Sequence, residues 1–295
     1  MRKVIAFILY IFYYPAIKRK MNQRGIILSI YGHDPKRESI EKIISWLIDK
    51  GYEFITPHEI LDFKNGELKK QKPVWLSFDD GWKSNYYELL PILEKYSIPA
   101  TIFVSTKAID DGYFWFSKAF ENRDSLLYTR VDDLWKMPNS KRVSIIKKLS
   151  DYTKGRVAMN ETELYNLSEC KLIYIANHTH DHVICDMCEK DELKNEIRLC
   201  EESIKEYTNN VCLKYFAYPN GNYDKQTVSV LKEMDYQIAA TTNLGFISKE
   251  TDLHKIPRNV LPDNASFHES ILQVYGLWTP FFDRIKKILR VKSHK

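Results

Sequence analysis

Cysteine is scarce in this sequence of 295 residues, and its distribution argues against a disulfide-stapled protein. The five cysteines are an odd number, and all of them fall between residues 170 and 212. Small secreted domains instead carry paired cysteines throughout a short chain. Cys185 and Cys188 form a lone C-x-x-C, whereas a zinc knuckle would need a second such pair. The composition therefore favours a reducing compartment.

The sequence also has no long basic stripe interleaved with aromatic residues, so we expect no nucleic-acid partner. Its 44 Lys and Arg against 39 Asp and Glu give a modest net charge of +5. No internal repeat or low-complexity tract is present. With 44% hydrophobic and 28% charged residues, the chain has the composition of a globular protein of one large domain or two small ones.

The apolar run near the N-terminus is shorter than the roughly 20 residues that a membrane-spanning helix needs. Residues 4–17 are almost wholly apolar and are flanked by basic residues on both sides. A signal peptide has a similar apolar core, but no small-residue cleavage site follows here. The tyrosines and Pro15 suit a segment at a membrane interface. We expect residues 1–24 to form such a segment or to pack on the protein's own core.

Residues 276–295 have the pattern of a basic amphipathic helix, with apolar side chains at helical spacing among lysines and arginines. Such helices bind anionic membrane surfaces, although either end of this chain alone would more readily pack on the core. Together, the two ends leave membrane association and core packing equally weighted. We therefore expect a protein that is cytoplasmic or peripheral to the cytoplasmic membrane. The alternative is an N-terminally anchored protein that faces the cell envelope.

Short apolar runs alternate with helical patterns through residues 25–275, the expected main domain. Strands are expected at 26–30, 74–78, 101–104, 172–176, 214–217, 237–241 and 256–258, with a weaker one near Phe54. Helices are expected at 39–50, 85–96, 161–167, 191–207 and 225–234. This alternation predicts an α/β fold, and motifs at strand ends favour a distorted (β/α) barrel of seven or eight strands. Residues 110–160 break the pattern and are expected to form a helical insertion. It begins with the aromatic cluster GYFWFSKAF, which either packs as core or stacks on sugars.

Two acidic residues, Asp79 and Asp80, follow the apolar run in LSFDDGW. Asp-Gly commonly marks a turn, so this stretch alone is ambiguous. His178 and His182 stand four apart after another expected strand, a spacing that places both side chains on one face of a helical turn. Because the carboxyl ends of barrel strands meet at one end of the fold, we expect these four side chains to converge.

Two histidines and one carboxylate make a metal set that leaves a coordination position open for water. The second carboxylate could then take a proton from that water, and the cation would offset the repulsion between the adjacent aspartates. We expect one divalent ion, with zinc as the default and cobalt, nickel or manganese as alternatives.

These motifs resemble those of the polysaccharide deacetylases, the NodB-homology domain of carbohydrate esterase family four. LSFDDG resembles the first family motif, HTHDH the second and YFAYPNGNYD the third, and TTNLG followed by IPR resembles the downstream portion. The likeness covers residues 25–261. It implies a distorted barrel that uses a metal to remove acetyl from an N-acetylated sugar. By this resemblance Asp79 is the catalytic base, and Asp80, His178 and His182 are the metal ligands.

The sequence departs from the family pattern in two places. Where the third motif often carries an arginine, this chain has Ala217, and Arg258 is the candidate replacement from the next strand. The late Leu-x-His motif of the general acid is also missing. In a permuted branch of the family that strand comes first, and here the first strand ends in ILSIYGHDP. His33 is therefore the candidate acid, although Tyr31 competes for the strict position, and His268 is a weaker candidate.

Other residues near the motifs are expected to play supporting roles. The turn from Tyr218 to Asn220 is expected to offer a backbone N–H to the oxyanion, alongside the metal. Trp82 and the Tyr218 ring either line the sugar site or simply pack. His180 is expected not to ligate the metal, and Asp181 is expected to be a turn residue.

The sequence therefore predicts a metal-dependent hydrolase that removes acetyl from N-acetylated sugars of a cell-envelope polysaccharide or a lipid-linked glycan. The basic, apolar ends favour a lipid-linked or membrane-bound substrate and an anionic membrane surface as a partner. An O-acetyl carbohydrate esterase is an alternative, because its metal chemistry would be the same. A non-catalytic, metal-containing glycan-binding protein is another, because the expected arginine and acid are displaced.

Overall fold

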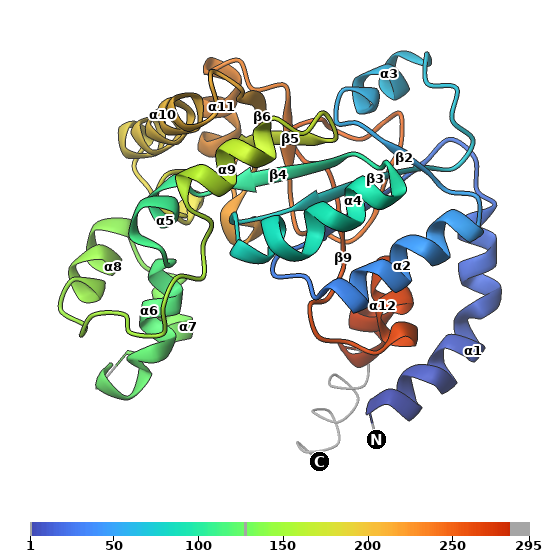
Figure 1. The fold of residues 1–295 in the computed structure, drawn as a ribbon, viewed down its shortest axis with the longest axis horizontal. Coiled ribbons are helices and arrows are strands. Elements are labelled where there is room, and N and C mark those ends of the chain that lie inside the picture. Colours follow the sequence, from blue (N-terminus) through green and yellow to red (C-terminus); the bar gives the residue numbers. More distant parts are fainter. Residues whose placement is uncertain (1, 127–128, 284–295) are drawn as a thin grey trace.

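The computed structural model describes residues 2–126 and 129–283 (Figure 1). In these residues the strands are β1 (Ile27–Gly32), β2 (Glu53–Ile55), β3 (Pro73–Phe78), β4 (Ala100–Val104), β5 (Ile173–Asn177), β6 (Leu213–Ala217), β7 (Ile238–Ala240), β8 (Phe246–Ile247) and β9 (Asn259–Val260). They form one sheet in the order β7-β6-β5-β4-β3-β1-β8, with β2 paired to β3 and β9 paired to β1. β8 runs antiparallel to β1, and the other pairs are parallel.

The sheet curls into a half-barrel whose two sides are linked by residues 256–260. Ile256 pairs with Ala240 of β7 through an isolated bridge, and Asn259 of β9 pairs with Ile30 of β1. One short segment thus connects the last strand of the parallel series to the first. The expected α/β barrel is confirmed in this mixed, partly closed form.

The described residues form helices, most of which cover the outside of the sheet. They are α1 (Arg2–Met21), α2 (Arg37–Asp49), α3 (Glu59–Asn65), α4 (Leu90–Tyr96), α5 (Thr106–Asp111), α6 (Trp115–Glu121), α7 (Val131–Leu134), α8 (Asn139–Ile146), α9 (Glu161–Ser168), α10 (Lys190–Tyr207), α11 (Lys225–Glu233) and α12 (Phe267–Val274). Shorter turns are the π-helical η1 (Asn85–Leu89) and the 3-10 turns η2 (Arg123–Ser125), η3 (Cys185–Met187) and η4 (Pro219–Gly221). The expected helices recur as α2, η1 with α4, α9, α10 and α11.

The central strands are buried on both faces, which explains their uninterrupted apolar sequences. Every residue of β1, β3 and β4 is buried. Inside the barrel, Trp75 and Phe103 belong to one apolar cluster, and Trp75 Nε1 donates a hydrogen bond to Thr101 Oγ1 over 3.0 Å. The opposite faces of the strands pack under the helices. The carboxyl ends of the strands are left as the place where polar side chains can meet.

Between β4 and β5 lie α5 to α8, in the segment where the sequence breaks the strand–helix alternation. α5 packs against α10, whereas α6 to α8 stand apart from the barrel helices, at the left of Figure 1. They build their own apolar cluster around Phe114, Trp115 and Ala119. Trp82, from the turn after β3, packs against this cluster, so the insertion touches the carboxyl end of the sheet.

α1 and α12 lie side by side at the right of Figure 1. In the described part of the chain, no helix has the length and apolar character that crossing a bilayer requires. Much of the amphipathic pattern expected at 276–295 lies outside the described residues. Within them, Trp278 is buried, and Phe281 and Phe282 pack against the same core cluster as α1 and α12.

Candidate active site

Asp79 and Asp80 leave β3 at its carboxyl end in a tight turn. Asp80 has a φ of 76° and Gly81 a φ of 92°, so two successive residues adopt the left-handed region. For an aspartate this conformation costs about 1–3 kcal/mol and persists only where neighbours fix it. Here the Asp79 N–H donates to Gly32 O and the Ser105 N–H donates to Asp80 O, each over 3.0 Å. Strands β1 and β4 thus hold the two carboxylates in place.

The two histidines follow β5 in an irregular loop, and the expected helical turn is wrong. Thr179 and His182 have φ values of 63° and 45°, which interrupt any helix. Asn177 Oδ1 accepts the Thr179 N–H over 2.8 Å, and Thr179 Oγ1 accepts the Val183 N–H over 3.0 Å. The loop nevertheless brings the imidazoles of His178 and His182 together, with ring centroids 4.9 Å apart.

Asp80, His178 and His182 converge at one point, and all three are buried. Nε2 of each histidine lies 3.2 Å from Asp80 Oδ1, and the three candidate ligand atoms lie within 4.8 Å of one another. The other Asp80 oxygen accepts the Trp82 Nε1 proton over 2.8 Å, which turns Oδ1 towards the histidines. Burial raises the pKa of Asp80, but the adjacent imidazoles of His178 and His182 outweigh it and hold the pKa well below its usual value. The carboxylate is therefore ionised.

The nitrogen and oxygen atoms that face one another in this group are suited to binding a metal cation. His178 Nδ1 lies 2.8 Å from Ala217 O, and because a carbonyl only accepts, Nδ1 carries the proton. With Nδ1 engaged by that carbonyl, Nε2 is the His178 nitrogen that faces Asp80. Burial, the largest influence on His182, lowers its pKa and favours a neutral ring. Two imidazole nitrogens and a carboxylate oxygen that face one another are the donor set with which proteins bind a divalent ion.

Asp79 lies beside this group and is held by Arg258. Arg258 Nη1 and Nη2 donate to the two carboxylate oxygens over 2.8 and 2.7 Å, in the fork geometry of strong ion pairs. Arg258 is fully buried and also donates to Ser77 Oγ and Thr241 O, each over 3.0 Å, and its guanidinium lies 4.4 Å from the Tyr31 ring centroid. Burial raises the pKa of Asp79. The charge of Arg258 and other neighbours outweighs this effect, so the pKa lies below its usual value. The candidate replacement arginine thus contacts the candidate base directly.

A cavity of about 270 Å³ opens over these side chains at the carboxyl ends of the strands. His33, the candidate acid, faces the same space as Asp79, and Asp263 lies beside it. Burial raises the pKa of Asp263, and the charge of His33 opposes that shift. Sequence reasoning missed Asp263, which follows β9 and has no motif around it. The remaining lining of the cavity is Asp80, Trp82, Phe116, Phe120, Trp135, His178, His182, Asn220 and Thr242.

The Tyr218 side chain does not line the cavity, so of the two roles expected for its ring it takes the packing one. The residue is fully buried, its hydroxyl donates to His254 O over 2.8 Å, and its ring stacks on Tyr223. Its N–H donates to Ala240 O over 3.0 Å and is unavailable to a substrate. The next residue of that turn is a proline without an N–H. Asn220, which lines the cavity, is therefore the residue of this turn whose N–H can face a substrate.

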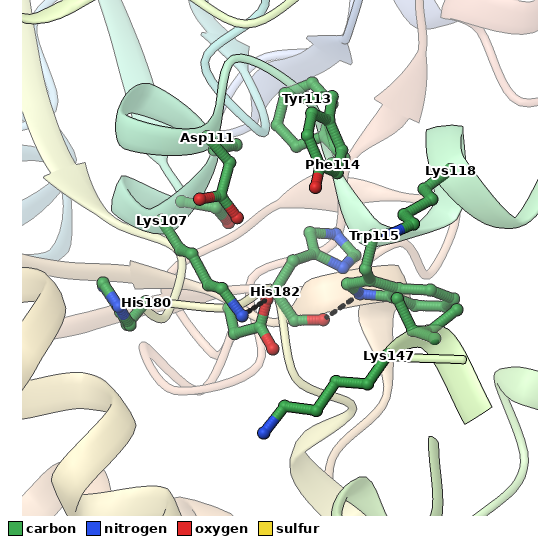
Figure 2. A pocket seen from close by; sticks show the side chains of 13 residues that line it. Lys107, Asp111, Tyr113, Phe114, Trp115, Lys118, Lys147, His180 and His182 are labelled. Atoms are coloured by element: carbon green, nitrogen blue, oxygen red, sulfur yellow. Dashed lines mark hydrogen bonds and ion pairs between the residues drawn. The ribbon is translucent and has the colours of Figure 1, made fainter. Parts of the chain in front are cut away.

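Two further histidines lie outside the group formed by Asp80, His178 and His182. His268 packs against the rings of Phe7 and Tyr10 on α1, which removes it as a candidate acid. His180 Nδ1 lies 2.9 Å from Thr106 Oγ1, and its ring lines a neighbouring cavity of about 130 Å³. Figure 2 shows that cavity, with His180 at the left of the view and His182 near its centre.

The insertion supports residues 178–183, which we call the ligand loop, from one side (Figure 2). Trp115 Nε1 and Arg142 Nη1 both donate to His182 O, over 3.2 and 3.3 Å. Phe116 and Trp135 place their ring centroids 5.2 and 5.8 Å from that of His182. These contacts hold His182 in its left-handed conformation. Sequence reasoning found the aromatic cluster but missed Arg142 and Trp135, because neither stands in a motif or at a regular spacing.

Asp181 does more than form a turn. Its carboxylate lies 3.3 Å from Lys107 Nζ and 3.6 Å from Arg142 Nη2, and its N–H donates to a Glu196 oxygen over 2.8 Å. The ligand loop is thereby tied to α5, α8 and α10. Such partners fix the position of neighbouring metal ligands.

Comparison with known proteins gives a family and a fold. Residues 66–239, more than half of the chain, match the sequence model of the polysaccharide deacetylase family. The chain is 24% identical over 239 residues to the poly-beta-1,6-N-acetyl-D-glucosamine N-deacetylase of Staphylococcus aureus, covering 81% of this chain and 71% of that protein. It is 24% identical over 229 residues to YxkH of Bacillus subtilis, covering 76% of this chain and 64% of that protein. The chain thus spans less than two thirds of the length of YxkH.

Two solved structures share the fold at lower identity. The deacetylase PplD of Streptococcus pyogenes, in complex with acetate, aligns with a TM-score of 0.58 at 21% identity, over 86% of this chain and 99% of that one. IcaB from Ammonifex degensii aligns with a TM-score of 0.62 at 17% identity, over 87% and 98%. The resemblance read from the motifs is thereby confirmed, and the protein belongs to the polysaccharide deacetylase family of hydrolases.

Proposed function

We propose that the protein is a metal-dependent deacetylase that hydrolyses the acetamide of N-acetylated sugars in a cell-envelope polysaccharide or a lipid-linked glycan. One observation carries this proposal. A carboxylate pinned by an arginine, Asp79 with Arg258, lies in one cavity beside the converging set of Asp80, His178 and His182. The name of the Staphylococcus aureus relative supports an N-acetylglucosamine polymer as the substrate class.

The ligands in this proposal are Asp80, His178 and His182, and the ion is zinc, with cobalt, nickel or manganese as ions that the same donors accept. When bound, such an ion polarises the acetyl carbonyl and makes water at the site more acidic. Trp82 supports this role by fixing the orientation of Asp80, and the Ala217 carbonyl does the same for His178.

Asp79 is the proposed base, because it is ionised and faces the cavity. Each of its oxygens accepts one hydrogen bond from Arg258 and keeps a lone pair for the proton of the attacking water. Arg258 acts as a positioning residue that fixes the carboxylate plane. The Asn220 N–H is the proposed donor to the developing oxyanion.

His33 is the proposed acid that protonates the leaving amine. It follows β1, lines the same cavity and has the Asp263 carboxylate close by. The assignment to the permuted branch is part of this proposal, because it depends on a histidine after the first strand. The exposed ring of Phe120, with Trp82 and Trp135, gives the cavity aromatic faces suited to sugar rings.

The decisive experiment pairs metal content with acetate release. Elemental analysis of the wild type should find about one zinc-like ion per chain, and His178→Ala should lose it. His180→Ala is the matched control, because this histidine bonds to Thr106 and should leave the metal content unchanged. An ion-free wild type after incubation with zinc would refute the proposal.

Substrate chemistry is then separated by two acetylated sugars. We expect acetate from N-acetylated β-1,6-linked glucosamine oligomers at a higher rate than from O-acetylated sugars. The reverse order would favour the O-acetyl esterase, which the same donor set could serve. Glycan binding without any acetate release, in a metal-loaded wild type, would leave the non-catalytic glycan-binding protein as the explanation.

A further inference from the structure

α1 has apolar side chains on two faces, and the described protein covers only one of them. Ala6, Leu9 and Ile17 are buried in the core cluster that includes α12. Seven of the thirteen exposed large hydrophobic side chains in the described residues lie in this one helix. A surface helix normally turns a polar face outward, and a contiguous apolar patch marks an interaction site. The outward residues, 47% to 73% exposed, are Val4, Phe7, Ile8, Ile11 and Phe12.

These outward side chains recur three or four positions apart, so they form one stripe along the helix. Positive charge stands at both ends of the stripe. Lys3 precedes it, and Lys18 and Arg19 follow it, all exposed. The sequence has no acidic residue before Asp34. An apolar stripe bracketed by cations complements a bilayer surface that carries anionic lipids, because apolar side chains enter the acyl boundary and cations stay among the headgroups.

The packing of α1 also decides how it would meet a membrane. The apolar run of residues 4–17 is about 21 Å long at 1.5 Å per residue, short of the roughly 30 Å of bilayer hydrocarbon. Its inner face is already occupied by α12, and Arg2 bonds to Glu269 at the start of that helix. Only a helix lying flat on the surface can bury the outer face while it keeps these contacts.

We propose that the outer face of α1 docks the protein on an anionic lipid surface, with the helix in the plane of the interface. Arg2 and Lys3 line one groove together with Asn264, the neighbour of Asp263 in the candidate active-site cavity. The start of the docked helix therefore lines a groove that adjoins the lining of that cavity at residues 263 and 264. If the proposed function holds, a sugar carried on a lipid would be presented there. The docking itself does not depend on the proposed function.

Flotation of the full-length, metal-loaded protein with two kinds of vesicle tests the docking. Wild type should float with phosphatidylcholine vesicles that contain phosphatidylglycerol and remain free with phosphatidylcholine alone. Ile8→Glu with Ile11→Glu should weaken partitioning at least about 100-fold, because two half-exposed apolar anchors become anions. Glutamate is a good helix former, so α1 should persist. The control is Tyr165→Glu with Val211→Glu, two exposed apolar side chains elsewhere in the described residues, and this variant should bind as wild type does.

The cations are tested separately. Lys18→Gln with Arg19→Gln should weaken partitioning roughly 30-fold, at about one kcal/mol per charge near the surface. Lys225→Gln with Lys232→Gln removes the same charge from α11 and should have no such effect. Metal content and acetate release from a soluble sugar should stay at the wild-type level in every variant. That readout separates failure of docking from failure of the proposed function.

Three results would overturn the proposal. Wild type could stay free of anionic vesicles, or the Ile8 and Ile11 double variant could bind them as wild type does. Alternatively, wild type could sediment as a lipid-independent dimer that this variant converts to monomer. The last result would identify the face as an interface between copies of the chain.

Discussion

Replacing Arg258 by methionine should destabilise the protein far more than the loss of a surface ion pair. The guanidinium and the Asp79 carboxylate are both buried, and two short hydrogen bonds join them. Removing one partner of a buried pair leaves an uncompensated charge and costs about 3–5 kcal/mol. Ser77 Oγ and Thr241 O also lose a donor. A metal ion beside Asp79 would offset part of the charge that is left unpaired. We therefore expect the free energy of unfolding of the zinc-loaded protein to fall by about 3 kcal/mol.

The assay is urea unfolding at neutral pH with saturating zinc, read as the free energy of unfolding. Arg198→Met is the matched control, since Arg198 pairs with Glu202 over 2.7 Å but both side chains are more than half exposed. Such a surface pair contributes less than about 1 kcal/mol. The double variant Arg258→Met with Asp79→Asn should recover part of the loss, because no charge is then left unpaired. Equal losses for Arg258→Met and Arg198→Met, or no recovery in the double variant, would refute the reasoning.

The remaining predictions concern the base, the ligand shell, pH and the tail. Asp79→Asn should keep its metal in elemental analysis and lose turnover at least about 100-fold, and loss of metal would reassign its role. Trp82→Phe keeps the ring but removes the bond to Asp80 Oδ2, so zinc affinity measured by competition with a chelator should fall about 10- to 100-fold. Burial raises the pKa of Glu196 from 4.5 to about 7. The folded state therefore holds an extra proton on Glu196 in that window, so the contribution of Glu196 to the free energy of unfolding should fall as pH rises from about 4.5 through 7. Glu196→Gln should flatten this slope and Glu202→Gln, on the same helix, should not. Deleting residues 280–295 should weaken flotation with anionic vesicles, and unchanged flotation would leave that tail with a packing role only.

The sequence predicts the central strands well because burial on both faces produces continuous apolar runs, as in β3 and β4. It does not reveal β8, whose two residues pair with β1 through contacts formed only in the folded sheet. The N-terminal helix was ambiguous for a related reason. Its apolar residues surround the whole helix, and only the position of α12 decides which of them become core.

The candidate site shows the same division. Asp79, Asp80, His178 and His182 stand in short motifs at strand ends, where the topology of a barrel brings them together. The sequence left the role of the Tyr218 ring open, because its packing depends on a carbonyl 36 residues away, at His254. The histidine spacing suggested a helical turn, yet left-handed residues that no spacing rule encodes shape the loop. Arg142 could not be found from the sequence, since its contact with the His182 carbonyl arises from the fold of the insertion.

The segment of residues 256–260 has a consequence for the order in which the protein becomes competent. It links β7 to β1, and it carries Arg258, which donates two hydrogen bonds to Asp79, 179 positions earlier in the chain. During synthesis, both histidines and both aspartates leave the ribosome well before that arginine does. If the proposed function holds, closure of the barrel and orientation of Asp79 by Arg258 are one event. A chain that ends before residue 256 would then contain the proposed metal ligands without the arginine that orients the proposed base.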